Sequence, residues 1–333
     1  MVTKAKKALL ASLTAFLCVM LTVFGLSMSA SSAKTAKADD TVIDLKQFVE
    51  NLKTANYNYD GQGITVKWSP VSGCYDTREG HTCTVGNVKA TANTPKRVNS
   101  GLTQFQLFEG KSDAITVKNV NFVYEPADFT VCENSNWKDS FTAAQAPAGQ
   151  LYFMTTRDVT FEGCTFDKTV LTMFNTTSTS IVMGCTFKNV YNNYAVKDIR
   201  GKNVTVEGCT FKDCGGAVMV SSTSAVNNVS ITGNTFTNVD VAGMAAEGKV
   251  GTRGLIQIAS SGKYSTATIS VSDNTATNCG PVVRQLNESV SFTKEAKSNL
   301  EELATGDSSL YTEDSKKIVA QVGNTEYYAL AEA

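Results

Sequence analysis

Apolar and polar residues alternate in short phrases that recur through the middle of the chain. The clearest phrases are ITVKNVNF at 115–122, VTFEGCTF at 159–166, SIVMGCTF at 180–187, VTVEGCTF at 204–211, VSITGNTF at 229–236 and ISVSDNTA at 269–276. Alternation with a period of two predicts a strand with one buried face. Repetition of such a phrase predicts a solenoid whose coils stack on one another.

The spacing of the phrases gives the length of one coil. The aligned positions are separated by 44, 21, 24, 25 and 40 residues, and they are Val120, Cys164, Cys185, Cys209, Asn234 and Asn274. The unit is therefore a little over twenty residues long. Each of the two long gaps holds either a second, degraded turn or an inserted loop.

The alternation slips in phase inside each phrase. Val204 and Val206 share one face of a strand, whereas Cys209 and Phe211 return to that face only if the chain bends at Gly208. Glycine tolerates the backbone angles that such a bend requires. Each phrase therefore predicts a strand, a sharp corner and a second short strand.

Stacking places identical positions of successive coils next to each other. The phenylalanines at 166, 187, 211 and 236 should form one interior column, and the cysteines at 164, 185 and 209 another, continued by Asn234 and Asn274. A cysteine there serves as a small apolar residue, and an asparagine should bind corner amides through its side chain. A single file of thiols lacks the converging short-spaced ligands of a zinc site, so we expect no metal.

The repeated Gly-Cys/Asn-Thr-Phe corners and their preceding strands resemble those of the pectate-lyase-like superfamily of right-handed parallel β-helices. The resemblance covers roughly residues 110 to 290. It implies an all-β solenoid with short capping helices at both ends. It does not imply one activity, because the superfamily includes lyases, hydrolases, esterases, adhesins and phage tailspikes.

The sequence predicts four segments. Residues 1–38 form a signal peptide, 39–110 an N-terminal cap helix with irregular first coils, 111–290 the β-helix, and 291–333 a C-terminal cap helix with a hairpin-like segment. Exposed strand edges at the ends of the solenoid should be covered. The helical patterns at 44–56 and 291–304 are the expected covers.

The N-terminus predicts export. Three lysines precede an apolar run from Ala8 to Leu26, and small residues follow before Asp39, where we expect the mature chain to start. The alternative is a retained membrane anchor. Cleavage would leave no membrane span, so we expect a secreted or cell-surface protein.

The last residues, IVAQVGNTEYYALAEA at 318–333, resemble a phrase of large surface proteins of gut Firmicutes, where it leads into further β-helix segments. Here the phrase either belongs to a truncated reading frame or is reused as a terminal hairpin. A structural stalk or fragment of a larger surface protein is therefore one of the functions that we consider.

Charge and cysteine content narrow the partners. The chain has 30 basic and 31 acidic residues, which argues against nucleic-acid binding. Cys74 and Cys83 lie nine residues apart in a glycine-containing loop and are the best candidates for a disulfide in an exported protein.

Catalytic constellations are weak. A lyase would need calcium, but the corner carboxylates Glu162 and Glu207 are separated by Met183 in the stack. Ca2+ is therefore expected only under the lyase alternative, and otherwise we expect no cofactor. The single histidine, His81, lies outside the recognisable coils. The remaining catalytic candidates for a divergent lyase or hydrolase are Asp198, Arg200, Asp213 and Asp240.

Binding has better support. Aromatic and charged residues gather in a predicted loop between two coils, a mixture suited to sugars or protein partners: Tyr191, Tyr194, Lys197, Asp198 and Arg200. The leading hypothesis is a non-catalytic binding or adhesion module for polysaccharides or surface glycoproteins. The alternatives are a carbohydrate-active enzyme on acidic polysaccharide and the structural stalk.

Overall fold

The structure is a computed structural model. It describes residues 41–69, 84–85, 88–89, 102–108, 114–130, 140–145, 147–175, 178–222, 228–245, 253–260, 268–285, 299, 320–322 and 325–327. Cys74, Cys83 and His81 lie outside these residues, as do residues 1–38. None of the helices formed by the described residues is long and apolar enough to cross a membrane.

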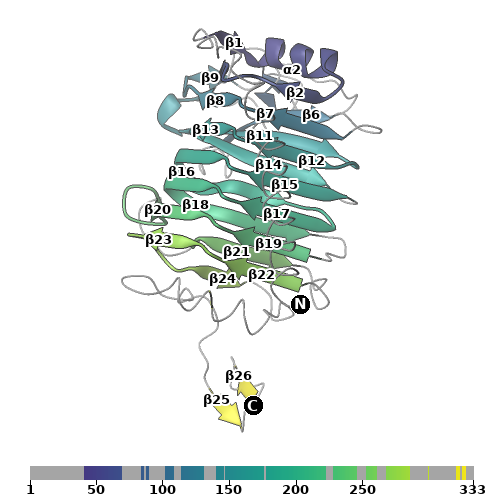
Figure 1. Cartoon of the computed structure of the whole chain (residues 1–333). Coiled ribbons are helices and arrows are strands. Elements are labelled where there is room, and N and C mark those ends of the chain that lie inside the picture. The colour runs from purple at the N-terminus through teal and green to yellow at the C-terminus, as the bar shows by residue number, and fades with distance from the viewer. Residues whose placement is uncertain are drawn as a thin grey trace, which may run out of the picture. The chain divides into compact units, whose positions relative to one another are not determined.

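The chain winds through three sheets of parallel strands (Figure 1). Sheet 1 has seven strands: β2 (Asn58–Asp60), β7 (Ile115–Lys118), β12 (Val159–Glu162), β15 (Thr179–Met183), β17 (Asn203–Glu207), β19 (Asn228–Thr232) and β22 (Thr268–Ser272). Each strand pairs in parallel with the corresponding strand of the next coil. This topology is that of a parallel β-helix, as the repeat predicts.

Sheets 2 and 3 are continuous because β16 and β18 run through both of them. Sheet 2 contains β1 (Val42–Asp44), β3 (Thr65–Trp68), β8 (Asn121–Tyr124), β13 (Thr165–Asp167), the first parts of β16 (Thr186–Ile199) and β18 (Thr210–Ser222), β20 (Thr235–Val239) and β23 (Thr275–Thr277). Sheet 3 contains β6 (Leu102–Phe108), β11 (Ala148–Thr155), β14 (Thr169–Asn175), the last parts of β16 and β18, β21 (Ile256–Ser260) and β24 (Val283–Gln285).

The corner between sheets 1 and 2 is the bend that the phase slip predicts. Its first residue has a φ between 52° and 66° on six coils: Asn119, Gly163, Gly184, Gly208, Gly233 and Asp273. Glycine adopts this left-handed conformation without steric cost, and asparagine and aspartate tolerate it better than other residues. The corner therefore has the same backbone conformation on the coils where Asn119 or Asp273 stands in place of glycine.

The two long gaps contain insertions and no extra turn. Asn121 pairs directly with Thr165, and Thr235 pairs directly with Thr275, so each pair belongs to adjacent coils. The first insertion holds the antiparallel strands β9 (Phe129–Thr130) and β10 (Ser140–Phe141) and the short helix η1 (Ala143–Gln145). The second lies between β20 and β21. Both insertions occur between the sheet 2 strand and the sheet 3 strand of their coil.

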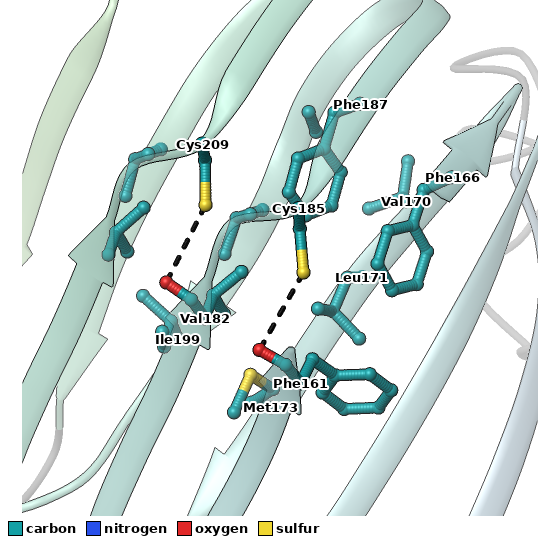
Figure 2. Packing of buried hydrophobic residues seen from close by; sticks show 14 of the residues in the cluster. Phe161, Phe166, Val170, Leu171, Met173, Val182, Cys185, Phe187, Ile199 and Cys209 are labelled. Atoms are coloured by element: carbon teal, nitrogen blue, oxygen red, sulfur yellow. Dashed lines mark hydrogen bonds between the residues drawn. The ribbon is translucent and has the colours of Figure 1, made fainter. Parts of the chain in front are cut away.

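The core follows the predicted columns. The rings of Phe122, Phe166, Phe187, Phe211 and Phe236 stack with centroids 4.7–5.2 Å apart and interplanar angles of 5–17°. These five side chains are fully buried. Figure 2 shows Phe166 and Phe187 beside the cysteine column. The column repeats at the strand spacing of about 4.8 Å, so the sheets set the distance between the rings.

Regular stacking begins before residue 111. Strands β2 and β3 pair in register with β7 and β8, and they form a first coil. Farther along the chain, β4 (Thr84–Val85) and β5 (Val88–Lys89) pair antiparallel, and β5 pairs antiparallel with β6. The region 39–110 thus combines a regular coil with irregular strands.

Helix α2 (Leu45–Thr54) forms the N-terminal cover. The Asp44 side chain accepts a hydrogen bond from the Gln47 amide and thereby begins the helix. Phe48 is fully buried and contacts Tyr59 and Phe122 edge-to-face, with centroids 5.8 and 5.1 Å away. The apolar face of the helix therefore packs on the first coil, as predicted.

At the C-terminal side, Asn299 is the one described residue of the predicted helix at 291–304. Its side-chain amide donates to the Val271 carbonyl at 2.7 Å. Strands β25 (Ala320–Val322) and β26 (Thr325–Tyr327) pair antiparallel.

Candidate functional site

Strand β16 breaks the regularity of the coils. Its pairing with β18 shifts twice, between Val190 and Tyr194 and again between Val196 and Ile199. The partners of Val190 and Tyr194 in β18 are Cys214 and Gly216, which are only two residues apart. The partners of Val196 and Ile199 are Val218 and Val220. Strand β16 therefore has extra residues at both places. Such bulges change the direction of side chains and are frequent beside functional sites.

The prediction that Tyr191, Tyr194, Lys197 and Asp198 lie in a loop is therefore wrong, whereas Arg200 directly follows the strand. Residues 186–199 form one strand, because the backbone continues the pairing of sheet 2 into sheet 3 across the bulges. The sequence pattern conceals this strand, since the extra residues interrupt the alternation of apolar and polar positions.

The first bulge has a structural role at Tyr194. This side chain is 5% exposed, and its hydroxyl donates to the Arg253 carbonyl at 2.7 Å. A methyl group on Gly216 would lie 2.7 Å from the tyrosine ring, so glycine provides the space for the ring. Tyr194 thus connects β16 to the second insertion through this hydrogen bond. Tyr191 is partly exposed at the start of the same bulge.

The second bulge presents charged residues. Lys197 pairs with Thr172, which in turn pairs with Tyr152 on the next coil, so the three positions form one row across sheet 3. Asp198 has a φ of 53° at the bulge, and Arg200 follows the end of the strand. Lys197, Asp198, Arg200 and Tyr152 are all partly exposed. We call these four residues the β16 patch.

Electrostatics link the members of the β16 patch. Burial raises the pKa of Tyr152 to about 12, while the positive charge of Arg200 lowers it and the negative charge of Asp198 raises it again. Both charges therefore act on the phenol group. The phenol stays protonated at neutral pH and can donate a hydrogen bond, but it cannot act as a base there.

Backbone contacts hold Arg200 in place. Its amide donates to the Met173 carbonyl at 2.9 Å, and its carbonyl accepts a hydrogen bond from the Ser180 hydroxyl. On the same face of sheet 3 as Tyr152, the side chains of Gln150 and Thr172 are buried, and the Gln150 amide donates a hydrogen bond to the Thr172 hydroxyl. The patch therefore lies on a fixed part of the sheet.

The other two catalytic candidates have structural partners. Asp240 is fully buried, and its carboxylate accepts hydrogen bonds from the backbone amides of Arg253 and Gly254 at 3.0 and 2.6 Å. Asp213 lies at the corner between sheets 2 and 3 and accepts from the Asn238 amide at 2.8 Å. Neither carboxylate belongs to the β16 patch.

The corner carboxylates have the spacing that the sequence predicts. Glu162 pairs with Met183, and Met183 pairs with Glu207, so the two acids are two coils apart. Glu162 instead forms an ion pair with Lys118 at 2.6 Å, which raises the pKa of the exposed lysine through hydrogen bonding and charge.

The buried cysteines are free and lie in two columns. Each thiol of Cys164, Cys185 and Cys209 lies 3.3–3.6 Å from two backbone carbonyl oxygens. Figure 2 shows the contact of Cys185 with Phe161 and that of Cys209 with Val182. In the second column, burial raises the pKa of Cys214 to about 12 and raises that of Cys279. Protonated thiols of this kind react slowly.

Tyr152 is the member of the β16 patch that sequence reasoning missed. Its strand, β11, follows the first insertion and contains no Gly-Cys-Thr-Phe corner. The available signal was the amphipathic Tyr152 between the apolar residues Leu151 and Phe153. Both neighbours are fully buried, so the tyrosine faces the other side of the strand.

Comparison with known proteins identifies the architecture. A family model described as a right handed beta helix region matches residues 65–253, which is more than half of the 333 residues. No curated protein and no solved structure matches the chain.

Proposed function

Because the chain belongs to the right-handed β-helix family, we propose that it uses the outer face of sheet 3 as a non-catalytic binding surface for polysaccharide. We further propose that the protein is exported and acts in the medium or on the cell surface. The observation that carries the binding proposal is the second bulge of β16. It interrupts the pairing of β16 with β18 where Lys197 and Asp198 lie, and the charge of Asp198 acts on Tyr152 in the same part of sheet 3.

The chemistry of the β16 patch suits an acidic sugar. Lys197 and Arg200 supply positive charge, and a guanidinium group binds a carboxylate through two parallel hydrogen bonds. The ring of Tyr152 offers an apolar face to a sugar, and its protonated hydroxyl offers a donor. Asp198 can accept hydrogen bonds from sugar hydroxyl groups.

The catalytic candidates support binding over turnover. Asp240 accepts two backbone amide bonds in the interior, and the phenol of Tyr152 is too weak an acid to serve as a base at neutral pH. Asp198 and Arg200 remain together in the patch, so an enzyme with a divergent site is the outcome to test against.

The test is one array of plant, bacterial and host glycans that measures both retained protein and released unsaturated or reducing ends, with and without calcium. We expect retention on acidic glycans without product. Retention should fall as salt rises, because the charges of the patch are partly exposed. Product release would identify an enzyme, and absence of retention would contradict the proposal.

Variants connect the result to the patch. Lys197→Ala should weaken retention about three- to tenfold, in line with the loss of one partly exposed ionic contact of about 1 kcal/mol. Lys212→Ala is the matched control, because Lys212 is an exposed lysine on the neighbouring sheet. An equal effect of both variants would show that net charge, and not the patch, governs retention.

A further inference from the structure

Three free cysteines occupy the same position on three consecutive coils. The amide of Thr186 donates to the Cys164 carbonyl, and that of Thr210 donates to the Cys185 carbonyl, both at 2.8 Å, so the cysteines are direct neighbours in the stack. The thiol of Cys185 interacts with the thiols of both Cys164 and Cys209. Figure 2 shows Cys185 and Cys209 with their sulfur atoms pointing to the same side.

The spacing of this thiol column is unfavourable for a disulfide. Residues at equal positions on adjacent coils are separated by about 4.8 Å, the distance between paired strands. A disulfide requires Cβ atoms about 3.5–4.5 Å apart, so oxidation would have to draw two coils together. The three thiols are reduced in the structure.

The same spacing fits another chemistry. A metal–thiolate bond is about 2.3 Å long, so a cation held between two sulfur atoms in a straight line needs them about 4.6 Å apart. Soft closed-shell cations such as Cu(I), Ag(I) and Hg(II) favour sulfur ligands and accept two-coordinate linear geometry. Among the described residues, no three His, Cys, Asp or Glu side chains converge on a metal site, but a linear site needs only two ligands.

We propose that the thiol column is a linear binding site for soft closed-shell cations, with Cys185 as the shared ligand. One cation lies between Cys185 and Cys164 or between Cys185 and Cys209. The site is distinct from the β16 patch and does not depend on the function proposed for that patch.

The surroundings of the column favour a cation. Six backbone carbonyl contacts of 3.3–3.6 Å direct the negative ends of peptide dipoles towards the three sulfur atoms. Each cysteine directly follows an exposed glycine, namely Gly163, Gly184 and Gly208. The column is therefore separated from solvent by the corner of the coil, and local opening of that corner provides the entry route.

The requirement for an uncharged complex determines how many protons the thiols release when a cation binds. Ag(I) between one thiolate and one neutral thiol leaves the core uncharged and releases one proton to the buffer. Hg(II) between two thiolates also leaves the core uncharged and releases two protons. A neutral complex avoids the large cost of an unpaired buried charge.

Ag+ is the probe for the test, which uses the full chain with Cys18, Cys74, Cys83 and Cys132 replaced by serine. Titration is followed by calorimetry and by the ultraviolet charge-transfer absorbance of silver thiolates. We expect saturable binding, an unchanged far-ultraviolet spectrum and a higher melting temperature, since binding to the folded state stabilises it. Zn2+ should not compete, because it requires four ligands.

Two valine variants locate the site. Cys185→Val should lower Ag+ affinity by at least about 100-fold, because loss of supporting groups alone costs 10- to 100-fold in metal sites. It leaves Cys164 and Cys209 two coils apart. Cys214→Val should change affinity by less than about threefold, because Val239 separates Cys214 from Cys279 in the second column.

Valine is compatible with both positions, because Val120 occupies the first column and Val190 the second. Retention of Ag+ affinity by Cys185→Val would overturn the proposal, as would absence of Ag+ binding in the parent chain. Detection of a disulfide at Cys185 by mass spectrometry of the unreduced protein would overturn it as well.

Discussion

At the scale of the residue, the corner between sheets 1 and 2 depends on two neighbouring side chains. The first adopts a left-handed conformation, and the second points into the core. Asn234 accepts from the Cys209 amide at 2.9 Å and donates to the Val206 carbonyl at 3.0 Å. On the next coil, Asn274 accepts from the Asn234 amide and donates to the Ile231 carbonyl. Asparagine thus satisfies the backbone groups that cysteine contacts only weakly.

Replacement of Asn234 by alanine should destabilise the protein by about 2–4 kcal/mol, because two buried backbone groups lose their partner. Asn228→Ala is the control. The side chain of Asn228 is exposed and donates a hydrogen bond to the Asn203 side chain at 3.0 Å. Removal of the Asn228 amide should therefore cost less than about 0.5 kcal/mol of stability. Urea unfolding measured by circular dichroism gives both values, and similar losses would contradict the role assigned to Asn234.

Gly184 tests the conformational requirement of the corner. Its φ is 60°, and an added Cβ would meet no atom closer than 4.0 Å, so the cost of a side chain is conformational. Gly184→Ala should destabilise by about 1–2 kcal/mol. Gly184→Asn should cost less, because Asn119 adopts the same conformation on another coil. The idea fails if the asparagine variant is the less stable of the two in thermal unfolding.

At the scale of the element, sequence reasoning succeeded where each coil repeats its neighbours. The corner, the phenylalanine column and the asparagine contacts could be predicted, because the same residue types recur at the same positions. The bulges of β16 could not be predicted, because among the described strands they occur in one coil only. Their extra residues are recognisable only when the partner strand β18 is known. Tyr152 was missed for a related reason, since only the pairing across coils places it in the same row of sheet 3 as Lys197.

Asp240 connects β20 to the start of β21. Its carboxylate accepts the amides of Arg253 and Gly254, and an added Cβ on Gly280 would lie 3.1 Å from its Oδ2 atom. Both amides donate to the same oxygen, Oδ2, so Asp240→Asn should weaken both contacts, because a neutral amide oxygen is a weaker acceptor than a carboxylate oxygen. We expect faster proteolysis between residues 241 and 254, without a change in the spectrum of the coils.

Asp213→Asn is the comparison for this experiment. Asp213 accepts a side-chain amide at a partly exposed corner, and asparagine occupies the equivalent place at Asn238. This variant should leave the proteolysis rate nearly unchanged. If it accelerates cleavage as much as Asp240→Asn, the anchoring role of Asp240 is wrong.

At the scale of the whole molecule, the coils form a linear array in which each contacts its neighbours, so the ends determine where unfolding begins. Helix α2 covers the first coil through Phe48. On the last coil, Asn299 donates to the Val271 carbonyl, as Asn274 does to Ile231 and Asn234 to Val206. The asparagine column therefore continues from the coils into the C-terminal segment.

Phe48→Ala should destabilise the N-terminal coils by about 3–5 kcal/mol, the usual cost of removing a buried phenylalanine. Hydrogen exchange should accelerate in β2, β3, β7 and β8, while β17 and β19 retain their protection. Phe187→Ala in the middle of the column is the control, and should affect coils on both sides. Uniform acceleration in the Phe48 variant would show that the array unfolds as one unit.

The two insertions have a consequence for how such a protein can change. Both leave the coil between sheets 2 and 3, whereas two residues join sheet 1 to sheet 2 on six of the coils. Register on either side of an insertion is preserved, as the pairs Asn121–Thr165 and Thr235–Thr275 show. Segments of foreign sequence could be inserted between sheets 2 and 3 without changing the register of strand pairing between coils. The fold thereby separates a regular scaffold from a display site that is free to vary in length and composition.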